Sequence, residues 1–188
     1  GDLMPRSHPC AKMPWIEAML GCPVRMVGDS IWAEKYPGDP EELIKRPPNI
    51  ERSPWFQLYL ETLRQLQTRL GDRFPLAVNA FRGTADMAVA VLGVEETCLD
   101  WVDRPDFMAR LMRVCTDVRL TMSEAIYKVV KPFHNGYLSP EQIWAPAPTV
   151  MTQCDHSVLL SARMYEEQIL PYDLEVIRSC PVSQFSPP

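Results

Sequence analysis

Phe74-Pro-Leu-Ala-Val-Asn-Ala80 is a short apolar run, and a second apolar run at residues 85–92 follows it and ends at Gly93. The first run has the length and composition of a strand buried in a parallel sheet, and the glycine fits the position just past a helix. The same order recurs with strand candidates at 23–27 and 149–153, each followed by a helix candidate. Strands that alternate with helices indicate an α/β fold with a parallel sheet.

The clearest helix signal covers residues 54–70. Ser53 is a good N-cap, Pro54 suits the first helical position, and Gly71 suits the position after the end. Apolar residues recur at intervals of three and four along this stretch, which predicts one buried face. Further helices are predicted at 13–20, at 105–130 with Asp103 as its cap, and at 161–178 with an interruption at Pro171. The stretches 28–52 and 133–148 are predicted to be irregular.

Composition predicts a globular protein, and the candidate site residues below predict a small-molecule substrate. The chain has 188 residues, of which 46% are hydrophobic, enough for one domain with a core. Its net charge is −5 and its basic residues are scattered, which argues against nucleic-acid binding. No stretch approaches the roughly 20 apolar residues that span a bilayer. Without a visible signal peptide the expected location is the cytoplasm, where six unclustered cysteines would be reduced thiols.

In folds built on parallel strands, chemistry is found at the carboxyl ends of the strands. Asp155 and His156 directly follow the strand predicted at 149–153. A carboxylate beside an imidazole can carry out acid–base catalysis, and we predict both as catalytic. The alternative is that Asp155 only satisfies backbone groups of a loop.

Three polar residues follow the strand predicted at 74–80. Asn79, Arg82 and Asp86 are predicted to bind substrate, with Arg82 suited to a carboxylate or phosphate. The alternative is an Arg82–Asp86 pair at a spacing of four that only steadies the start of a helix.

Weaker candidates lie in the two predicted loops. Asp29 and Trp32 follow the first strand, and either they contribute to a substrate site or they belong to a solvated loop. Trp144 in the second loop, with Tyr137 and His134, would line a pocket for a flat ligand or pack on neighbouring loops. Asp29 and Trp144 are predicted substrate contacts.

Metal and cofactor sites are not predicted. His8 and Cys10 carry the right donor atoms for zinc. However, no further ligand stands at a useful spacing from them. We therefore expect neither a metal nor a cofactor.

Three segments, in order, resemble the uroporphyrinogen decarboxylase superfamily. They are Phe81-Arg-Gly-Thr-Ala-Asp-Met-Ala-Val-Ala-Val-Leu-Gly93, Arg104-Pro-Asp-Phe-Met-Ala-Arg-Leu-Met112, and Gln153-Cys-Asp155 with Leu159-Leu-Ser-Ala-Arg-Met-Tyr-Glu-Glu-Gln-Ile-Leu-Pro-Tyr172. The resemblance covers about residues 13–178. It implies a TIM-type (β/α)₈ barrel, here incomplete, so that residues 1–188 form a single partial domain with an irregular tail at 179–188.

The resemblance implies an enzyme that decarboxylates a tetrapyrrole side chain in porphyrin biosynthesis. Two alternatives stay open: a corrinoid-linked zinc methyltransferase of the same superfamily, and a truncated barrel without catalysis. The family's Arg-Gln-Ala-Gly-Arg motif is absent from residues 1–188, and so is the segment after the Leu-Pro-Tyr helix in which the methyltransferases keep a His-x-Cys motif and a distant Cys as zinc ligands. Exposed strand edges of an incomplete barrel would favour homodimers or self-association.

Overall fold

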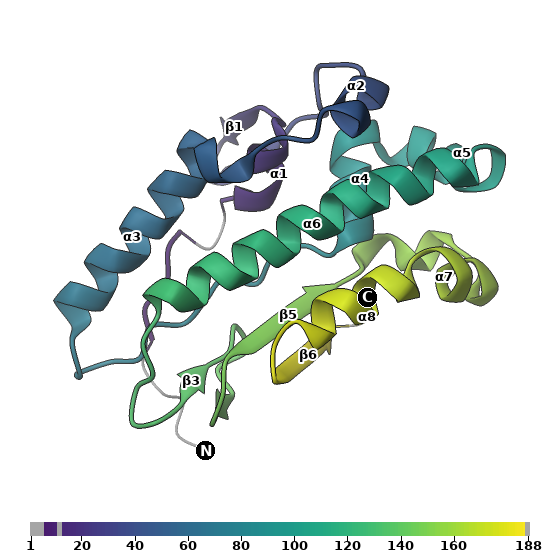
Figure 1. Cartoon of the computed structure of the whole chain (residues 1–188). Helices are drawn as coiled ribbons and strands as arrows, with labels where there is room; N and C mark the ends of the chain where they lie inside the picture. The colour runs from purple at the N-terminus through teal and green to yellow at the C-terminus, as the bar shows by residue number, and fades with distance from the viewer. Residues whose placement is uncertain (1–5, 11–12, 187–188) are drawn as a thin grey trace.

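Helix α6, Pro105–Val129, is the central helix of the molecule and is 25 residues long. The computed structural model describes residues 6–10 and 13–186. The apolar stripe of α6 is buried, and helices α1, α2, α3, α4, α5 and α8 all pack against it. Figure 1 shows α6 running along most of the molecule, with α3 on one side and α7 and α8 on the other.

The predicted helices are present. They are α1 (Trp15–Leu20), α3 (Pro54–Leu70), α4 (Thr84–Leu92), α7 (Ala162–Gln168) and α8 (Leu170–Arg178). Gly21 ends α1 in the left-handed conformation, with φ at 99°. Ser161 caps α7 by accepting a hydrogen bond from the Met164 N–H at 3.2 Å. The predicted interruption is confirmed, because Pro171 lies in the first turn of the new helix α8.

Two α-helices were missed, together with the short 3₁₀ helices η1 (Ile50–Arg52) and η2 (Asp155–Leu159). Helix α2, Pro40–Lys45, lies in the stretch predicted to be irregular, and the Asp39 carboxylate caps it by accepting from the Glu41 N–H. Helix α5, Val94–Asp103, follows α4 directly, since Gly93 at φ 86° turns the chain. Asp103 therefore belongs to α5, and the prediction that it caps α6 is wrong: Arg104 occupies that position.

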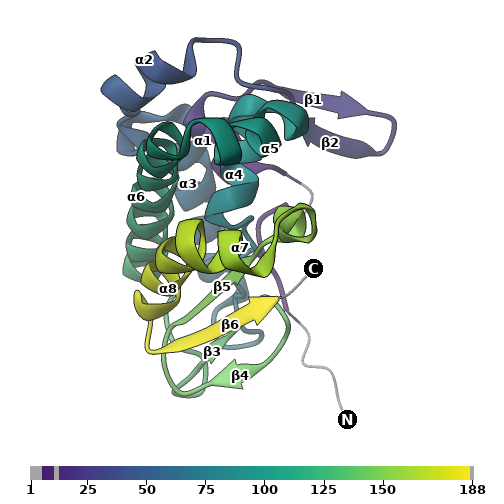
Figure 2. The same cartoon turned by 90° about the vertical axis from the view of Figure 1, so that its right-hand side faces the viewer.

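The strand predicted at 23–27 is present but belongs to a different kind of sheet. Strand β1, Val24–Val27, pairs antiparallel with β2, Ser30–Ala33. Gly28, at φ 57°, opens the two-residue turn that returns the chain immediately. The hairpin projects from one end of the molecule (Figure 2), and Met26 and Val27 are exposed, so this strand is not a buried parallel one.

The other two predicted strands take part in parallel pairing. Strand β5 is Thr149–Gln153, and it pairs in parallel with β6, Val182–Ser186. The segment at 74–80 is extended and largely buried, with Leu76 and Ala77 in parallel bridges to Ser7 and Leu138. The expected irregular tail is therefore wrong for residues 182–186. A strand edge pairs through backbone groups, so the tail did not need an apolar alternation to join it.

A small hairpin occupies the loop predicted at 133–148. Strands β3 (Tyr137–Leu138) and β4 (Trp144–Ala145) pair antiparallel at the end of the molecule opposite to β1 and β2 (Figure 2). Within the described residues the strands form three two-stranded sheets. No helix among those residues is long and apolar enough to cross a membrane.

Candidate functional site

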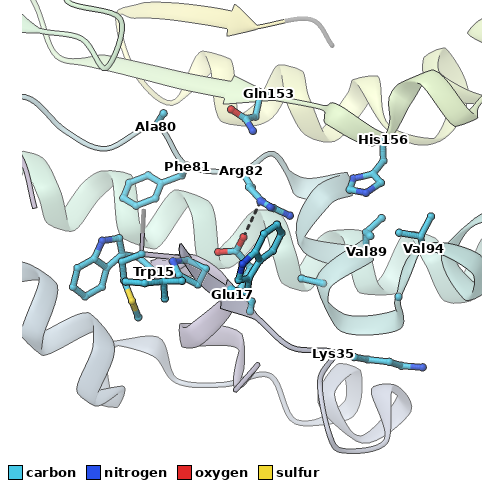
Figure 3. Close-up of a pocket in the computed structure, with 17 residues that line it drawn as sticks. Trp15, Glu17, Lys35, Ala80, Phe81, Arg82, Val89, Val94, Gln153 and His156 are labelled. Carbon is cyan, nitrogen blue, oxygen red and sulfur yellow. Dashed lines mark ion pairs between the residues drawn. The ribbon is translucent and has the colours of Figure 1, made fainter. Parts of the chain in front are cut away.

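A cavity of about 440 Å³ opens where the parallel segments end. Ala80, Phe81 and Arg82 line it just after the extended segment, and Gln153 and His156 line it at and beyond the end of β5. The opposite wall comes from α1, β2 and the end of α4. Figure 3 shows His156 and Gln153 facing Trp15, Glu17 and Lys35 across this space. The rule that selected the carboxyl ends of strands thus leads to a concave site lined by residues at these ends.

His156 is held by the buried carboxylate of Asp86. Its ring Nδ1 lies 2.8 Å from Asp86 Oδ1, and the same carboxylate accepts the backbone N–H groups of Asp155 and His156, each at 3.2 Å. Asp86 is fully buried, in the first turn of α4, whereas the His156 side chain is one-fifth exposed. With Nδ1–H donated to the carboxylate, Nε2 of the neutral ring is left as a proton acceptor on a residue that lines the cavity.

A second charged pair crosses the cavity wall. Arg82 Nε lies 3.2 Å from Glu17 Oε1, and Glu17 is only 3% exposed. Burial raises the pKa of the Glu17 carboxyl, and the nearby Arg82 charge partly opposes that rise. Glu17 was not among the predicted site residues. Its sequence signal was an acidic residue inside the apolar run Trp15-Ile-Glu-Ala-Met-Leu20.

The alternative interpretation of an Arg82–Asp86 contact does not match the structure, in which each residue has another partner. Arg82 bonds to Glu17 on α1, and Asp86 bonds to η2, so the spacing of four does not determine either partner. Three aromatic side chains complete the wall: Trp15, Trp32 and Phe81. Trp32, one of the candidates in the first predicted loop, lines the cavity from β2.

The remaining predicted site residues lie outside this cavity lining. The Asn79 amide accepts from the Tyr59 hydroxyl at 3.0 Å and donates to the carbonyls of Pro9 and Cys10, so it anchors the segment at 6–10. Asp155 is exposed, and its carboxylate accepts from the Gln153 amide at 3.1 Å.

Trp144 and Asp29 belong to the two hairpins. Trp144 lies on β4 so close to Gly136 that a side-chain carbon at that position would meet its ring at 2.2 Å. Asp29 is in the exposed turn between β1 and β2. Of the weaker loop aromatics, Tyr137 packs edge-on against Tyr127, with ring centroids 5.5 Å apart.

A buried polar layer supports the site from behind. The Asp173 carboxylate on α8 is fully buried and accepts from the Tyr165 hydroxyl at 2.9 Å and the Thr84 hydroxyl at 3.4 Å. Burial raises the pKa of Asp173 to about 6. Arg119 on α6 donates to the Met151 carbonyl at 2.6 Å, and burial lowers the pKa of its guanidinium to about 10.

No protein-family model matches the chain, and no curated protein matches its sequence. Its structure, however, is similar to that of a solved methyltransferase from Methanosarcina mazei. The TM-score is 0.66 at 14% sequence identity, and the match covers 99% of this chain. The chain spans about half (51%) of the length of that methyltransferase chain. At this identity the likeness is one of fold.

Zinc does not fit the residues that the structure describes. In residues 6–10 and 13–186 no three His, Cys, Asp or Glu side chains are grouped to hold a metal ion. The imidazole of His8 lies 2.7 Å from the Pro9 carbonyl, and Cys10 is exposed. We therefore assign no chemical step to a metal.

Proposed function

We propose that this chain is part of a (β/α)₈-barrel methyltransferase of the uroporphyrinogen decarboxylase superfamily, and that the cavity binds its small-molecule substrate. The similarity to the Methanosarcina mazei methyltransferase over nearly the whole chain carries the proposal. The parallel pairings at Ser7, Leu76, Ala77, Leu138 and in β5–β6 suit such a barrel. The cavity lies at the strand ends where barrel enzymes carry out their chemistry.

The His156–Asp86 pair would act as the proton acceptor. In methyl transfer to a thiol, the sulfur lone pair forms the new bond to carbon, and the donor keeps the electron pair of the bond that breaks. The thiol proton then moves to His156 Nε2. The Asp86 carboxylate, 2.8 Å from Nδ1, stabilises the imidazolium that results.

Methylcobalamin and a small thiol, 2-mercaptoethanol, provide the test on the protein as encoded by its gene. We expect thiol-dependent loss of the methylcobalamin absorbance. His156→Ala should slow it roughly 10²-fold or more, the usual contribution of a general base. Arg163→Gln is the control, because Arg163 is 82% exposed on α7. No thiol-dependent reaction, or an unimpaired His156→Ala variant, would contradict the proposal.

Decarboxylation of a tetrapyrrole is the second candidate. Arg82 favours it, since a guanidinium at a strand end can bind a carboxylate. A substrate with many carboxylates needs several cations, however, and both Lys35 and Arg82 in this cavity lining already pair with an acid, Glu96 and Glu17 respectively. Release of CO₂ from uroporphyrinogen would establish this function in place of methyl transfer.

A further inference from the structure

The Arg82 guanidinium forms an ion pair with a buried residue behind it. Glu17 contacts Nε at 3.2 Å, and the Glu17 side chain is 4% exposed while that of Arg82 is 43% exposed. A guanidinium donates five hydrogen bonds in a rigid plane. A contact at Nε leaves the edge formed by Nη1 and Nη2 free for a partner on the open side. Figure 3 shows the pair meeting at the cavity wall.

The two sides of this pair differ in solvation. The carboxylate is buried in α1, so its charge acts from behind the guanidinium. An anion in the cavity would contact the Nη edge at hydrogen-bond distance and would be farther from Glu17. Because Coulomb energy falls with distance, attraction to Arg82 exceeds repulsion by Glu17 at such a position. Lys35 also lines the cavity, but it pairs with Glu96, so Arg82 is the basic residue that would bind the anion.

The rest of the cavity wall suits a flat, apolar group. Trp15, Trp32 and Phe81 contribute their rings, and about 440 Å³ is within the range of small-ligand sites. Planar ring faces stack on planar ligands. The same lining therefore offers the Arg82 guanidinium to a planar anion and aromatic rings to the rest of a flat ligand.

We propose that the cavity binds a small, flat organic carboxylate, with Arg82 as the carboxylate-binding residue and Glu17 as the positioning residue that holds it. The proposed ligand is a substrate class for the methyltransferase proposed above. Its role in a reaction depends on that proposed function, but its binding does not. The binding itself follows from the geometry of the pair and is tested without turnover.

Benzoate and benzamide are the probes, since they share shape and differ in charge. Dissociation constants are measured by titration calorimetry on the protein as encoded. We expect benzoate to bind about tenfold more tightly than benzamide, as a charge-assisted bidentate contact would provide. Arg82→Gln should remove this preference, and Arg82→Lys should reduce it because an ammonium has no fork. The exposed control Arg163→Gln should keep it.

Glu17 is tested by the same ratio. Glu17→Leu and Glu17→Gln both remove the negative charge of Glu17, so their difference isolates its contact with Nε. Glu17→Leu lets the guanidinium swing, and its preference for benzoate should be severalfold lower than that of Glu17→Gln, which still accepts from Nε. Equal binding of the two probes by the wild type, or an undiminished preference in Arg82→Gln, overturns the carboxylate subsite. Equal preferences in Glu17→Leu and Glu17→Gln overturn the positioning role.

The methyltransferase proposal is tested independently of the carboxylate subsite. Methyl transfer is measured with methylcobalamin and thiol, whereas the benzoate preference is measured without turnover. A benzoate preference without any methyl transfer would keep the subsite and remove the reaction. Methyl transfer without a benzoate preference would support the reaction and contradict the carboxylate subsite.

Discussion

At the scale of single residues, Asp86 connects two segments that lie far apart in the sequence. Its fully buried carboxylate, on α4, accepts two backbone N–H groups of η2 and contacts the His156 ring. A buried carboxylate needs such partners, because an unpaired buried charge is strongly destabilising. The same three contacts orient His156, so this residue combines structural and chemical roles.

Replacing Asp86 by Asn tests this double role. An amide has one acceptor oxygen, and its NH₂ group cannot accept from the backbone N–H groups, so we expect unfolding free energy to fall by roughly 1–3 kcal/mol. Methyl transfer should fall about 10²-fold or more, since the imidazolium loses its counter-charge. Urea unfolding and the methylcobalamin assay measure the two effects. Asp103→Asn, at an exposed position, is the control and should match the wild type.

Asp173 makes stability depend on pH. Its pKa is raised to about 6 in the folded protein by burial, against 3.8 ordinarily, so the folded state holds the proton more tightly than the unfolded chain. This stabilisation is complete below about pH 4 and is lost as the pH rises to about 6, a change of roughly 3 kcal/mol.

The test compares the wild type with Asp173→Asn, which does not titrate at this position. The melting temperature of the wild type minus that of the variant should become lower as the pH is raised from 4 to 7, because only the wild type loses stability at this position. A difference that stays constant across that range would show that Asp173 does not titrate there. Arg119, Asp86, Cys154 and Tyr165 influence the same carboxyl and are retained in both proteins.

At the scale of elements, the start of α4 lies directly against the end of β5. A side-chain carbon at Gly83 would lie 1.8 Å from the Gln153 carbonyl oxygen and 3.1 Å from the Thr152 hydroxyl. Gly83 is therefore the position where backbone meets backbone, and this close approach brings Asp86 within reach of η2. The glycine is required by contact and not by its φ of −72°.

Gly83→Ala should separate these elements. We expect a loss of about 3 kcal/mol or more, above the usual cost of overpacking because a backbone atom cannot rotate away. Guanidinium unfolding measures it. Gly71→Ala is the comparison without a steric contact: nothing lies within 4 Å of the added carbon, and the cost of roughly 1–3 kcal/mol comes from a backbone at φ 55° and ψ −132°. A loss below about 1 kcal/mol in Gly83→Ala would show that the contact at Gly83 relaxes.

At the scale of the whole molecule, α6 unites the helices on both sides of the cavity. Leu111, in its second turn, is fully buried within the main core. We expect Leu111→Ala to lower the unfolding free energy by about 2–5 kcal/mol, because the surrounding helices cannot all close the space. Urea unfolding measures this loss. Arg110→Ala, next to it on the exposed face, removes an ion pair with Glu41 and a long contact with the Asp106 carbonyl, and it should cost under about 1 kcal/mol.

Predicted and observed elements agree best where the signals are local. The bounds of α3 at Pro54 and Leu70 and those of β5 at Thr149 and Gln153 follow from prolines, a glycine and apolar runs within a few residues, although Ser53 stands at the N-cap of α3 without a side-chain capping bond. Helix α2 had the same kind of signal in Asp39-Pro-Glu-Glu42 and was missed inside a proline-rich stretch. The cytoplasmic location, self-association and the lack of cofactors stay predictions.

The sequence by itself determined α1, α3, α4, α6, α7 and α8, the buried segment at 74–80, and the strand ends near which Arg82, Asp86 and His156 stand. Those features depend on hydrophobic period and on backbone preferences, which act over short distances. Only the tertiary structure decided that Asp86 pairs with His156, 70 positions away, and Arg82 with Glu17. It also decided that residues 182–186 form a strand. Such partners are chosen by which surfaces meet when the chain closes on itself, and no pattern within one segment carries that information.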